Sequence, residues 1–485
     1  MKFEAVIGLE VHSQLKTKTK LFSSSNNEFG EDPNANVSVV DLGLPGALPV
    51  INDKAVDLAI LAGLSTDCKI NKKSTFARKH YFYPDLPKGY QISQYDEPLA
   101  SDGVIIIPDI QGIDKKIRIN RIHMEEDAGK LIHDISDSYS MVDLNRAGVP
   151  LIEIVSEPDI SSADEAVSYL KKLRSILIYA NVSDCNMEEG NFRCDANISI
   201  RQLGEKELGV KAEIKNINSF KFVKKAIEYE IERQSKILSK GDKVVQETRL
   251  FNSNLNKTFS MRSKEDAHDY RYFPDPDLKP LILSDERIDT LRNQSLQSYN
   301  NKIELYTKDY KLSKDDSEVL LSSKELSKYF EDTLEVIFEP KLASKWIITE
   351  IIKYIGLSSF VLEVVNFAQF LKVMKDGKIN NNSGKDLLAK LASSNDDVNS
   401  LIESMDLVQE SSEDLLSSII DQVLDDNPDE AKRLLNGEVK LVSFFMGQVM
   451  KETKGKGNPG VISTCLLYTS PSPRDLSTSR MPSSA

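Results

Sequence analysis

The sequence lacks the features that define several common classes of protein. Its four cysteines show no C-x-x-C spacing, which argues against a zinc ribbon and a disulfide scaffold. No apolar run reaches the roughly 18 residues of a membrane-spanning helix. The N-terminus enters an alternating pattern without the apolar stretch of a signal peptide. We therefore expect a protein of the reducing cytoplasm that has no membrane partner.

The usual nucleotide-binding and nucleophile motifs are absent as well. Gly384-Lys385 lacks the upstream glycine and the following Ser or Thr of a P-loop, and no G-x-G-x-x-G occurs. Any nucleotide site is therefore of another type. No G-x-S-x-G turn is present and no cysteine lies in a recognisable nucleophile motif. We therefore do not expect this chain to be a self-contained glutaminase.

Charge is spread unevenly along the chain. The net charge of −13 disfavours a nucleic-acid binder, because such proteins are more often basic. Residues 401–430 hold ten acids and no Lys or Arg, whereas residues 431–456 hold six Lys or Arg and two acids. A local basic group of this kind can bind phosphate even when the total charge is negative.

The distribution of residue types along the chain predicts an α+β protein. Residues 1 to about 290 are rich in Gly, Pro and short alternating runs, which indicates a mainly antiparallel-sheet domain with a few helices. Apolar residues then recur at spacings of three and four, which predicts an all-α domain and a small all-α tail domain. The helical stretches that we expect include Tyr329–Phe338, Lys341–Val373 and Val439–Thr453.

The last 21 residues, 465–485, differ in composition from the rest of the chain. One interpretation is a disordered Ser/Pro-rich tail. We favour another, because CLLYTSPSPRD resembles the in-frame translation of a sequencing-library adapter. The native chain would then end near Thr464, and residues 465–485 would be a non-native tail.

Five predicted strands carry charged side chains on one face. In Phe3–Val11 apolar residues alternate with polar ones, so that Glu10 and His12 share a face. On a single strand, a solvated outer face would explain them. The other strands are Asn191–Arg201 with Arg193 and Asp195, Val210–Asn218 with Lys211, Glu213 and Lys215, Leu151–Val155 with Glu153, and Ile117–Asp127 with His123 and Glu125.

If these strands share a sheet, carboxylates and imidazoles gather on one surface. Closely packed carboxylates repel one another, and a divalent cation relieves the repulsion. Oxygen ligands favour Mg²⁺ or Mn²⁺, and a histidine shifts the preference toward Mn²⁺ or Zn²⁺. The loop at residues 77–91 adds Lys79, Lys88 and several tyrosines, which are suited to ATP phosphates and a base. A charged surface loop held by prolines is the alternative.

Several long stretches resemble one family, the B subunits of bacterial aspartyl/glutamyl-tRNA amidotransferases. They are IGLEVH at 7–12, ARKHYFYPDLPKGYQISQ at 77–94, HMEEDAGK at 123–130, DLNRAGVPLIEIVSEP at 143–158, GNFRCDANIS at 190–199, EIKNINSF at 213–220, MRSKEDAHDYRYFPDPDL at 261–278 and LVSFFMGQVMKETKGKGNP at 441–459. The resemblance extends in order from residue 1 to about residue 463.

This resemblance implies an architecture, partners and a reaction. The domains would be a cradle domain at 1–290, a helical domain at 291–405 and a YqeY-like tail domain at 406–464. The chain would form a heterotrimer with an A subunit, which is a glutaminase, and a small C subunit. It would use ATP and Mg²⁺ to phosphorylate the side-chain carboxylate of misacylated Glu-tRNA(Gln) or Asp-tRNA(Asn). Ammonia channelled from the glutaminase would then displace the phosphate.

The resemblance also gives roles to the candidate residues. Glu10, His12 and Glu125 match the metal-binding, catalytic positions, and Asp195 and Glu153 are weaker candidates for metal ligands. Lys79 and Lys88 would hold nucleotide phosphates. The residues expected to line the chamber are Arg193, Lys211, Glu213 and Lys215. Salt bridging of the two lysines with Glu213 is an equally good explanation.

The tail domain would contact the body of the tRNA through basic side chains. Contacts to phosphates position RNA without reading its sequence. The residues expected to make them are Lys432, Arg433, Lys440, Lys451, Lys454 and Lys456. The alternative function is a non-catalytic tRNA-binding scaffold of the same complex, although a scaffold has no need for Glu10, His12 and Glu125 on one face.

Overall fold

The computed structural model describes residues 3–109, 111–132, 138–263, 270–295, 299–357, 359–409, 412–435, 438, 440–453 and 456–468. The chain divides into two compact units. Unit 1 comprises Met1–Leu305 and Leu321–Lys324, and unit 2 comprises Tyr306–Leu320 and Glu325–Ala485. The predicted domain boundaries at residues 290, 405 and 464 stay predictions.

Unit 1 is built on a nine-stranded sheet with the strand order β14-β13-β12-β11-β1-β10-β7-β6-β2. Only β12 and β13 pair in parallel among these strands. The strands, in chain order, are β1 Phe3–Gln14, β2 Lys69–Ile70, β6 Ala100–Pro108, β7 Asp114–Glu126, β10 Pro150–Ser156, β11 Phe192–Gln202, β12 Ala212–Ile217, β13 Glu247–Asn252 and β14 Lys257–Ser263. The predicted mainly antiparallel sheet is confirmed.

All five strands predicted from charged alternation are present, and they are neighbours. β12, β11, β1, β10 and β7 follow one another across the middle of the sheet. The apolar side chains of β1 are buried, with Ile7, Leu9 and Val11 at most 1% exposed. Burial of one face fixes the register, because a slip by one residue would turn every side chain over.

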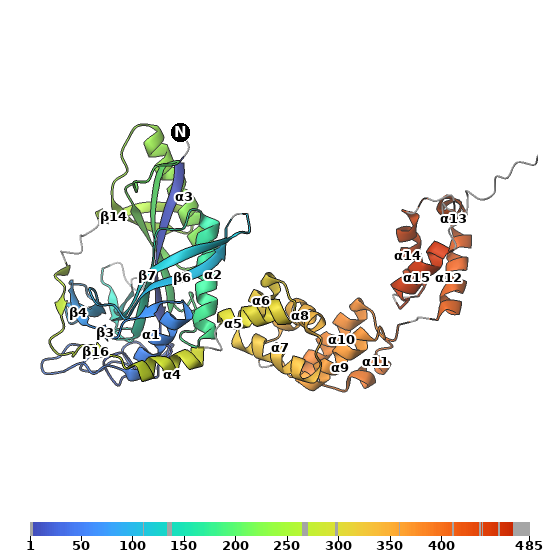
Figure 1. The fold of residues 1–485 in the computed structure, drawn as a ribbon, viewed down its shortest axis with the longest axis horizontal. Coiled ribbons are helices and arrows are strands. Elements are labelled where there is room, and N and C mark those ends of the chain that lie inside the picture. Colours follow the sequence, from blue (N-terminus) through green and yellow to red (C-terminus); the bar gives the residue numbers. More distant parts are fainter. Residues whose placement is uncertain are drawn as a thin grey trace, which may run out of the picture. The chain divides into compact units, whose positions relative to one another are not determined.

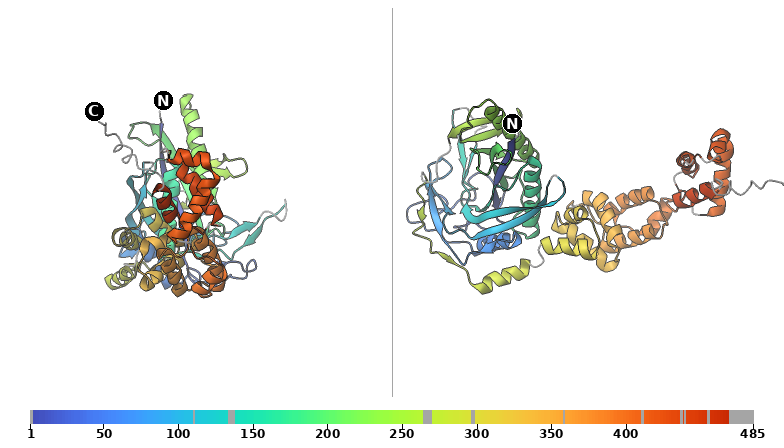
Figure 2. Two further views of the ribbon diagram at one scale, coloured as in Figure 1. Left: turned by 90° about the vertical axis from the view of Figure 1, so that its right-hand side faces the viewer. Right: turned by 45° about the horizontal axis from the view of Figure 1, so that its top comes forward.

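Smaller sheets and helices complete unit 1. The smaller sheets are β15-β4-β5 (Phe273–Pro274, Phe76–His80, Tyr90–Gln94), β16-β3 (Leu281–Ile282, Lys73–Ser74) and β8-β9 (Lys130–Ile132, Met141–Asp143). The helices are α1 Asp53–Ser65, α2 Ala163–Tyr179, α3 Phe220–Ser239, α4 Asp285–Ser295 and α5 Tyr299–Glu304. α2 contacts α3 and β6, and α3 contacts β11 (Figure 1). The small β15-β4-β5 sheet contacts the central sheet through β5 and β7. Two further views of the ribbon are given in Figure 2.

Unit 2 is helical throughout its described elements. They are η2 Leu305–Asp309, which begins at the end of unit 1, α6 Lys314–Leu320, α7 Lys324–Val336, α8 Pro340–Thr349, η3 Ile351–Lys353, α9 Val364–Lys375, α10 Asn381–Ser394, α11 Val398–Ser404, α12 Glu413–Asp426, α13 Pro428–Leu435, α14 Leu441–Glu452 and α15 Pro459–Tyr468. Within the described segments, no helix is both long and apolar enough to cross a bilayer.

One helical prediction is wrong in detail. Lys341–Val373 is not one helix but two, α8 and α9, with the short turn η3 between them. Gly356 lies in the intervening segment with φ +86°, a conformation that ends a helix and that glycine adopts without strain. The predicted helix at Val439–Thr453 is confirmed as α14.

The last four helices share a core of their own. Leu416, Phe445, Val449 and Ile462 are buried in one cluster. Leu466 belongs to the same cluster and is also buried, although it lies in the segment predicted to be non-native. The helix α15 therefore uses residues from both sides of position 465, and the adapter origin of 465–485 stays a prediction.

Candidate functional site

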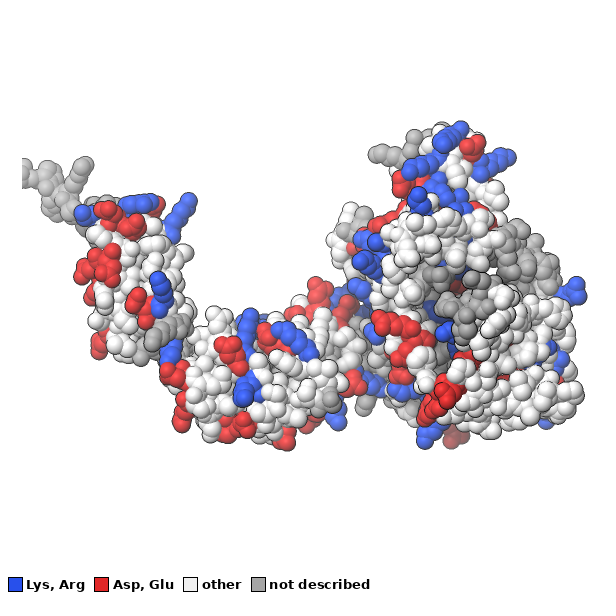
Figure 3. Space-filling model, turned by 180° about the vertical axis from the view of Figure 1, so that it is seen from behind, with Lys and Arg blue, Asp and Glu red and all other residues white. Residues whose placement is uncertain are grey.

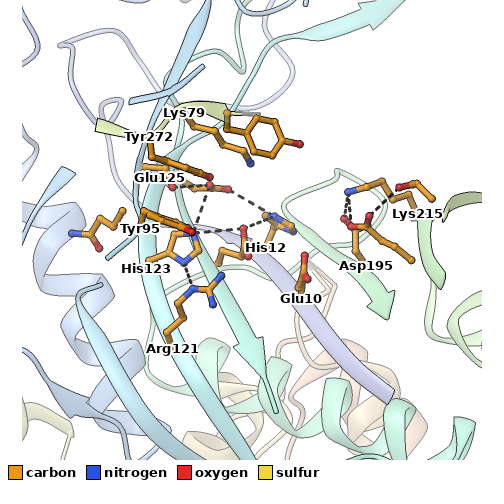
Figure 4. A pocket seen from close by; sticks show the side chains of 16 residues that line it. Glu10, His12, Lys79, Tyr95, Arg121, His123, Glu125, Asp195, Lys215 and Tyr272 are labelled. Atoms are coloured by element: carbon orange, nitrogen blue, oxygen red, sulfur yellow. Dashed lines mark hydrogen bonds and ion pairs between the residues drawn. The ribbon is translucent and has the colours of Figure 1, made fainter. Parts of the chain in front are cut away.

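A cavity of about 280 Å³ lies on the charged face of the central strands in unit 1. The central strands supply one part of its lining and the β4–β5 segment supplies another. The residues that line it are Glu10, His12, Lys79, Ser93, Gln94, Tyr95, Arg121, His123, Glu125, Glu153, Asp195, Glu213, Lys215, Thr248, Tyr270 and Tyr272 (Figure 4). Eight of the eleven candidates chosen from residues 1–290 therefore converge on one site.

The closest group in this cavity consists of His12, Glu125 and Glu153. His12 Nε2 lies 3.2 Å from Glu153 Oε2 and 3.8 Å from Glu125 Oε1. One donor atom from each of the three residues lies within 4.8 Å of the others. Figure 4 shows His12 and Glu125 pointing toward one another. Three strands that alternate in direction thus place a nitrogen and two carboxylate oxygens around one point.

Strand register explains why these residues meet. His12 of β1 is directly opposite Glu153 of β10, and Glu153 is directly opposite His123 of β7. Side chains opposite one another on neighbouring strands share a face and lie within contact distance. His123 Nε2 is 3.6 Å from Glu153 Oε2 and 3.8 Å from Glu125 Oε2. Two imidazoles therefore flank two carboxylates.

The electrostatics of the cluster favour positive charge. Burial alone would lower the pKa of His12, but its hydrogen bond to Glu153 and the charges of Glu153, Glu125 and Asp195 raise it to about 9. Burial likewise opposes ionisation of Glu153, yet His123 and His12 hold its pKa well below its usual range. A site with these properties suits a divalent cation, because the cation replaces the proton that the carboxylates otherwise attract.

A second charged group lies beside the first. Glu10 is opposite Asp195 in the β1–β11 register, and two facing carboxylates repel unless they are paired. Lys215 Nζ donates to Asp195 Oδ2 at 2.7 Å and lies 3.2 Å from Glu213 Oε1, while Asn197 Nδ2 donates to Glu10 Oε1 at 2.8 Å. The ion pairing with Glu213 considered for Lys215 is therefore present, and Lys215 lines the cavity as well.

Lys79 supplies a cation that forms no ion pair with any residue that the structure describes. Its Nζ lies 4.9 Å from the ring centre of Tyr270 and 5.9 Å from that of Tyr81. Across the described ranges, no carboxylate lies within ion-pairing distance of it. Burial would lower the pKa of Lys79, but Tyr272, Glu125 and Glu153 raise it. The side chain therefore carries a positive charge that is available to an anionic ligand.

The other three candidates from residues 1–290 lie outside the cavity lining. Lys88 forms an ion pair with Glu126, and both side chains are at most 9% exposed. Arg193 Nη2 donates to Asp127 Oδ1 at 3.0 Å. Lys211 is exposed and precedes β12. The structure therefore separates Lys88 from Lys79. The predicted single loop at residues 77–91 is wrong, because Lys79 lies in β4 and only the segment between β4 and β5 is irregular.

Sequence reasoning did not select several residues that line the cavity. Arg121, whose Nε lies 3.4 Å from His123 Nδ1, and the stacked rings of Tyr95 and Tyr272, 4.3 Å apart, are among them. One signal for the tyrosines was present, since Tyr272-Phe273-Pro274-Asp275 echoes YFYPD at residues 81–85. The second segment includes β15, which pairs with β4, the strand directly before the first segment.

The basic candidates of the tail are partly paired. Arg433 donates hydrogen bonds from Nε and Nη2 to the two carboxylate oxygens of Glu438, each at 2.9 Å. Lys456 forms an ion pair with Asp406. Lys432, Lys440 and Lys451 are exposed, and Lys454 lies outside the described residues. Acidic and basic side chains both lie on the visible face of this region (Figure 3).

The fold and the cavity define a class of protein: an α+β domain with one large sheet, whose central strands present carboxylates, imidazoles and a lysine to a single cavity. Comparison with known families identifies it more narrowly. A model described as the GatB/GatE catalytic domain matches residues 5–289, and one described as the GatB domain matches residues 328–468. The chain belongs to the GatB family.

Curated relatives are similar in sequence to this chain over almost its whole length. A Thermodesulfovibrio yellowstonii protein, named as the B subunit of aspartyl/glutamyl-tRNA(Asn/Gln) amidotransferase, is 48% identical over 468 residues, covering 96% of this chain and 98% of that protein. A Persephonella marina protein of the same name is 50% identical over 474 residues, covering 96% of this chain and 99% of that protein. The family resemblance stated from the motifs is confirmed.

Proposed function

We propose that this chain is the B subunit of a glutamine-dependent tRNA amidotransferase, and that the cavity around His12 activates the substrate. ATP would phosphorylate the side-chain carboxylate of Glu-tRNA(Gln) or Asp-tRNA(Asn), and ammonia would then displace phosphate to give the amide. The partners would be a glutaminase and a small third protein, in the cytoplasm where translation occurs. The observation that carries this proposal is the convergence of His12, Glu125 and Glu153 on one point.

The two carboxylates of the cavity fit Mg²⁺, whereas the imidazole of His12 is a less usual ligand for this ion. Two carboxylates and one imidazole come from three different strands, and oxygen-rich sites completed by substrate phosphates are typical of Mg²⁺ in ATP-using enzymes. His12, Glu125 and Glu153 would hold the ion, with Glu10 and Asp195 as further ligands from the neighbouring group. When bound, Mg²⁺ neutralises charge on the phosphates of ATP.

The remaining side chains bind and orient the reactants. Lys79 is placed to pair with a phosphate, because its charge has no carboxylate partner within ion-pairing distance in the described part of the chain. Glu213 and Asp195 hold Lys215 at the cavity wall, where it would pair with the substrate carboxylate. A carboxylate needs such activation because its oxide is a poor leaving group, whereas phosphate leaves readily.

A non-catalytic scaffold is the second candidate function, and one experiment separates the two. The reconstituted trimer is given misacylated tRNA, ATP and Mg²⁺, and tRNA-dependent ATP cleavage is measured for the wild type and for Glu125→Gln. We expect cleavage to fall by at least about 100-fold, the size of effect found when one charge-stabilising group is removed from an active site.

The matched control is Glu205→Gln. Glu205 is an exposed carboxylate of the same unit that does not line the cavity, so its loss leaves cleavage unchanged. Full ATP cleavage by Glu125→Gln would support the scaffold. Glutamine hydrolysis by this chain alone would revive a third possibility, a self-contained glutaminase.

A further inference from the structure

A second cavity of about 900 Å³ adjoins the first in unit 1. The two cavities share Lys79, Lys215, Thr248 and Tyr270 in their linings, so these side chains form the connection between them. The second cavity is more than three times as large, and it contains none of the clustered carboxylates of the first. Its chemistry is therefore different.

Aromatic rings line much of this second cavity. Tyr81, Phe82 and Tyr83 come from the segment between β4 and β5, and Tyr270 faces them from the segment before β15. The Phe82 side chain is 89% exposed and that of Tyr83 is 56% exposed. Large rings left open to solvent at a cavity wall lose apolar burial, and such exposure marks binding surfaces more often than it serves folding.

One edge of the Phe82 ring lies close to the backbone at Gly89. Gly89 has φ +74°, and a Cβ built on it would lie 3.1 Å from Cε1 of Phe82. Any other residue at position 89 would therefore be strained and would also press on the ring. One edge of Phe82 is supported by Gly89, which leaves the rest of the ring free to stack against a ligand.

The proposed substrate brings a nucleobase close to the activation site. The amino acid of an aminoacyl-tRNA is esterified to the terminal ribose, so the terminal base lies close to the carboxylate that reacts. Proteins hold the single-stranded ends of RNA by stacking unpaired bases on aromatic side chains. Arg271, which lines the second cavity and not the first, supplies a positive charge that positions a phosphate of the tRNA.

We propose that the second cavity receives the 3′-terminal nucleotide of the substrate tRNA, with its base stacked on the Phe82 ring. The esterified amino acid then enters the first cavity between Lys79 and Tyr270. This inference rests on the proposed function, since it supposes an aminoacyl-tRNA substrate. It adds a binding site for the base and assigns its recognition to Phe82, with Tyr83 as the neighbouring ring.

Binding of the base is measured directly with a fluorescent probe. A stable amide-linked aminoacyl-tRNA analogue carries 2-aminopurine in place of the terminal adenine and is added to the reconstituted trimer. Stacking on Phe82 quenches the fluorescence. We expect the quenching to be lost in Phe82→Ala and restored in Phe82→Tyr. Equal quenching in Phe82→Ala would overturn the proposal, and so would displacement of the probe by a non-hydrolysable ATP analogue, which would assign the cavity to ATP.

Steady-state kinetics give the second readout. Stacking of one nucleobase on an aromatic ring strengthens binding by about 5- to 150-fold. In Phe82→Ala we therefore expect the KM for misacylated tRNA to rise by that factor. The kcat and the KM for ATP should stay near the wild-type values. Phe29→Ala is the matched control, because Phe29 is 73% exposed and lines neither cavity. A rise in the KM for ATP alone would contradict the proposal.

The two readouts separate this inference from the proposed function. The fluorescence assay needs no ATP cleavage, so a loss of quenching in Phe82→Ala supports the nucleotide site even if Glu125→Gln keeps full activity. Conversely, loss of activity in Glu125→Gln together with unchanged quenching in Phe82→Ala leaves the proposed function standing and rejects the nucleotide site.

Discussion

Replacement of Lys79 by methionine tests whether the cavity binds ATP phosphates through this side chain. Methionine keeps most of the apolar stem and removes the charge. Lys79 Nζ lies 4.9 Å from the Tyr270 ring centre and has no carboxylate within ion-pairing distance in the described ranges. Its loss therefore breaks no ion pair of the folded protein, and the variant should fold as the wild type does.

The size of the effect follows from the charge that is removed. A lysine and a phosphate about 4 Å apart attract each other by about 4 kcal/mol at an effective dielectric constant of about 20. The net value of a charged hydrogen bond, after desolvation, is about 1.5–3 kcal/mol. We therefore expect kcat/KM for ATP to fall by about 10- to 150-fold.

The assay is tRNA-dependent ATP cleavage by the reconstituted trimer, with glutamine hydrolysis measured in parallel. Lys79→Arg, which keeps the charge, should recover part of the loss. Glutamine hydrolysis without tRNA should not change, since it belongs to the proposed glutaminase partner. An unchanged kcat/KM for ATP in Lys79→Met would refute the reasoning, because no other described lysine without a carboxylate partner lines the first cavity.

Three further predictions concern residues other than Lys79. Lys88→Met should destabilise unit 1 by about 3–5 kcal/mol, because the buried carboxylate of Glu126 loses its cation and, of its described partners, keeps only the hydrogen bond from the Ile92 backbone N–H. Chemical denaturation measures this, and a wild-type unfolding free energy would contradict the pairing. Although burial opposes ionisation of Asp127, the charges of Arg193 and Arg146 hold its pKa well below its usual range. The ionised Asp127 therefore contributes its full stabilisation above the unfolded-state pKa of about 3.9, and this contribution is lost as the pH falls toward the folded-state pKa. Asp127→Asn should be less stable than the wild type at pH 7. In thermal melts it should lose less stability than the wild type between pH 5 and pH 3. A matching pH dependence of the two proteins would contradict the ion pairs. Changing the exposed Lys440 and Lys451 together to Gln should weaken tRNA binding and reduce the slope of log K against log salt by about 0.7–0.9 for each phosphate that is no longer bound; an unchanged slope would mean that these lysines do not touch phosphate.

The strand faces could be predicted from sequence because alternation is a local property. Apolar residues at every second position in β1 place Glu10 and His12 on one face, whatever the rest of the chain does. The same argument held for β7, β11 and β12, whereas in β10 the signal was a single charge, Glu153, among apolar residues. The confirmed family resemblance then predicted the α+β fold and its helical C-terminal half.

Which carboxylate meets which imidazole could not be predicted from those patterns. That depends on strand order and register, which join residues far apart in the chain. Sequence reasoning ranked Glu10 above Glu153 as a ligand, whereas the register places Glu153 opposite His12 and Glu10 opposite Asp195. His123 was noted as a polar residue of its strand, but its contact with Glu153 follows only from the β7–β10 pairing.

Lys79 and Lys88 also show that local sequence does not predict contacts between residues far apart in the chain. The sequence predicted one loop for both, but Lys79 lies in β4 and Lys88 lies in the turn before β5. Lys88 contacts Glu126, a residue 38 positions away, and only the folded arrangement reveals that pairing. The tyrosines of the cavity wall had a faint signal in the repeated Tyr-Phe-Pro-Asp pattern, but its meaning required the pairing of β15 with β4.

The measurement that tests the central claim most directly is divalent-cation binding. Mn²⁺ replaces Mg²⁺ as a paramagnetic probe, and its binding to the reconstituted trimer is followed by electron paramagnetic resonance for the wild type and for a His12→Ala, Glu125→Gln, Glu153→Gln triple variant. We expect one site in the wild type and at least a 100-fold lower affinity in the variant, because even a group that only supports a metal ligand contributes about 10- to 100-fold. A variant that binds Mn²⁺ as tightly as the wild type would show that these three side chains do not hold a metal.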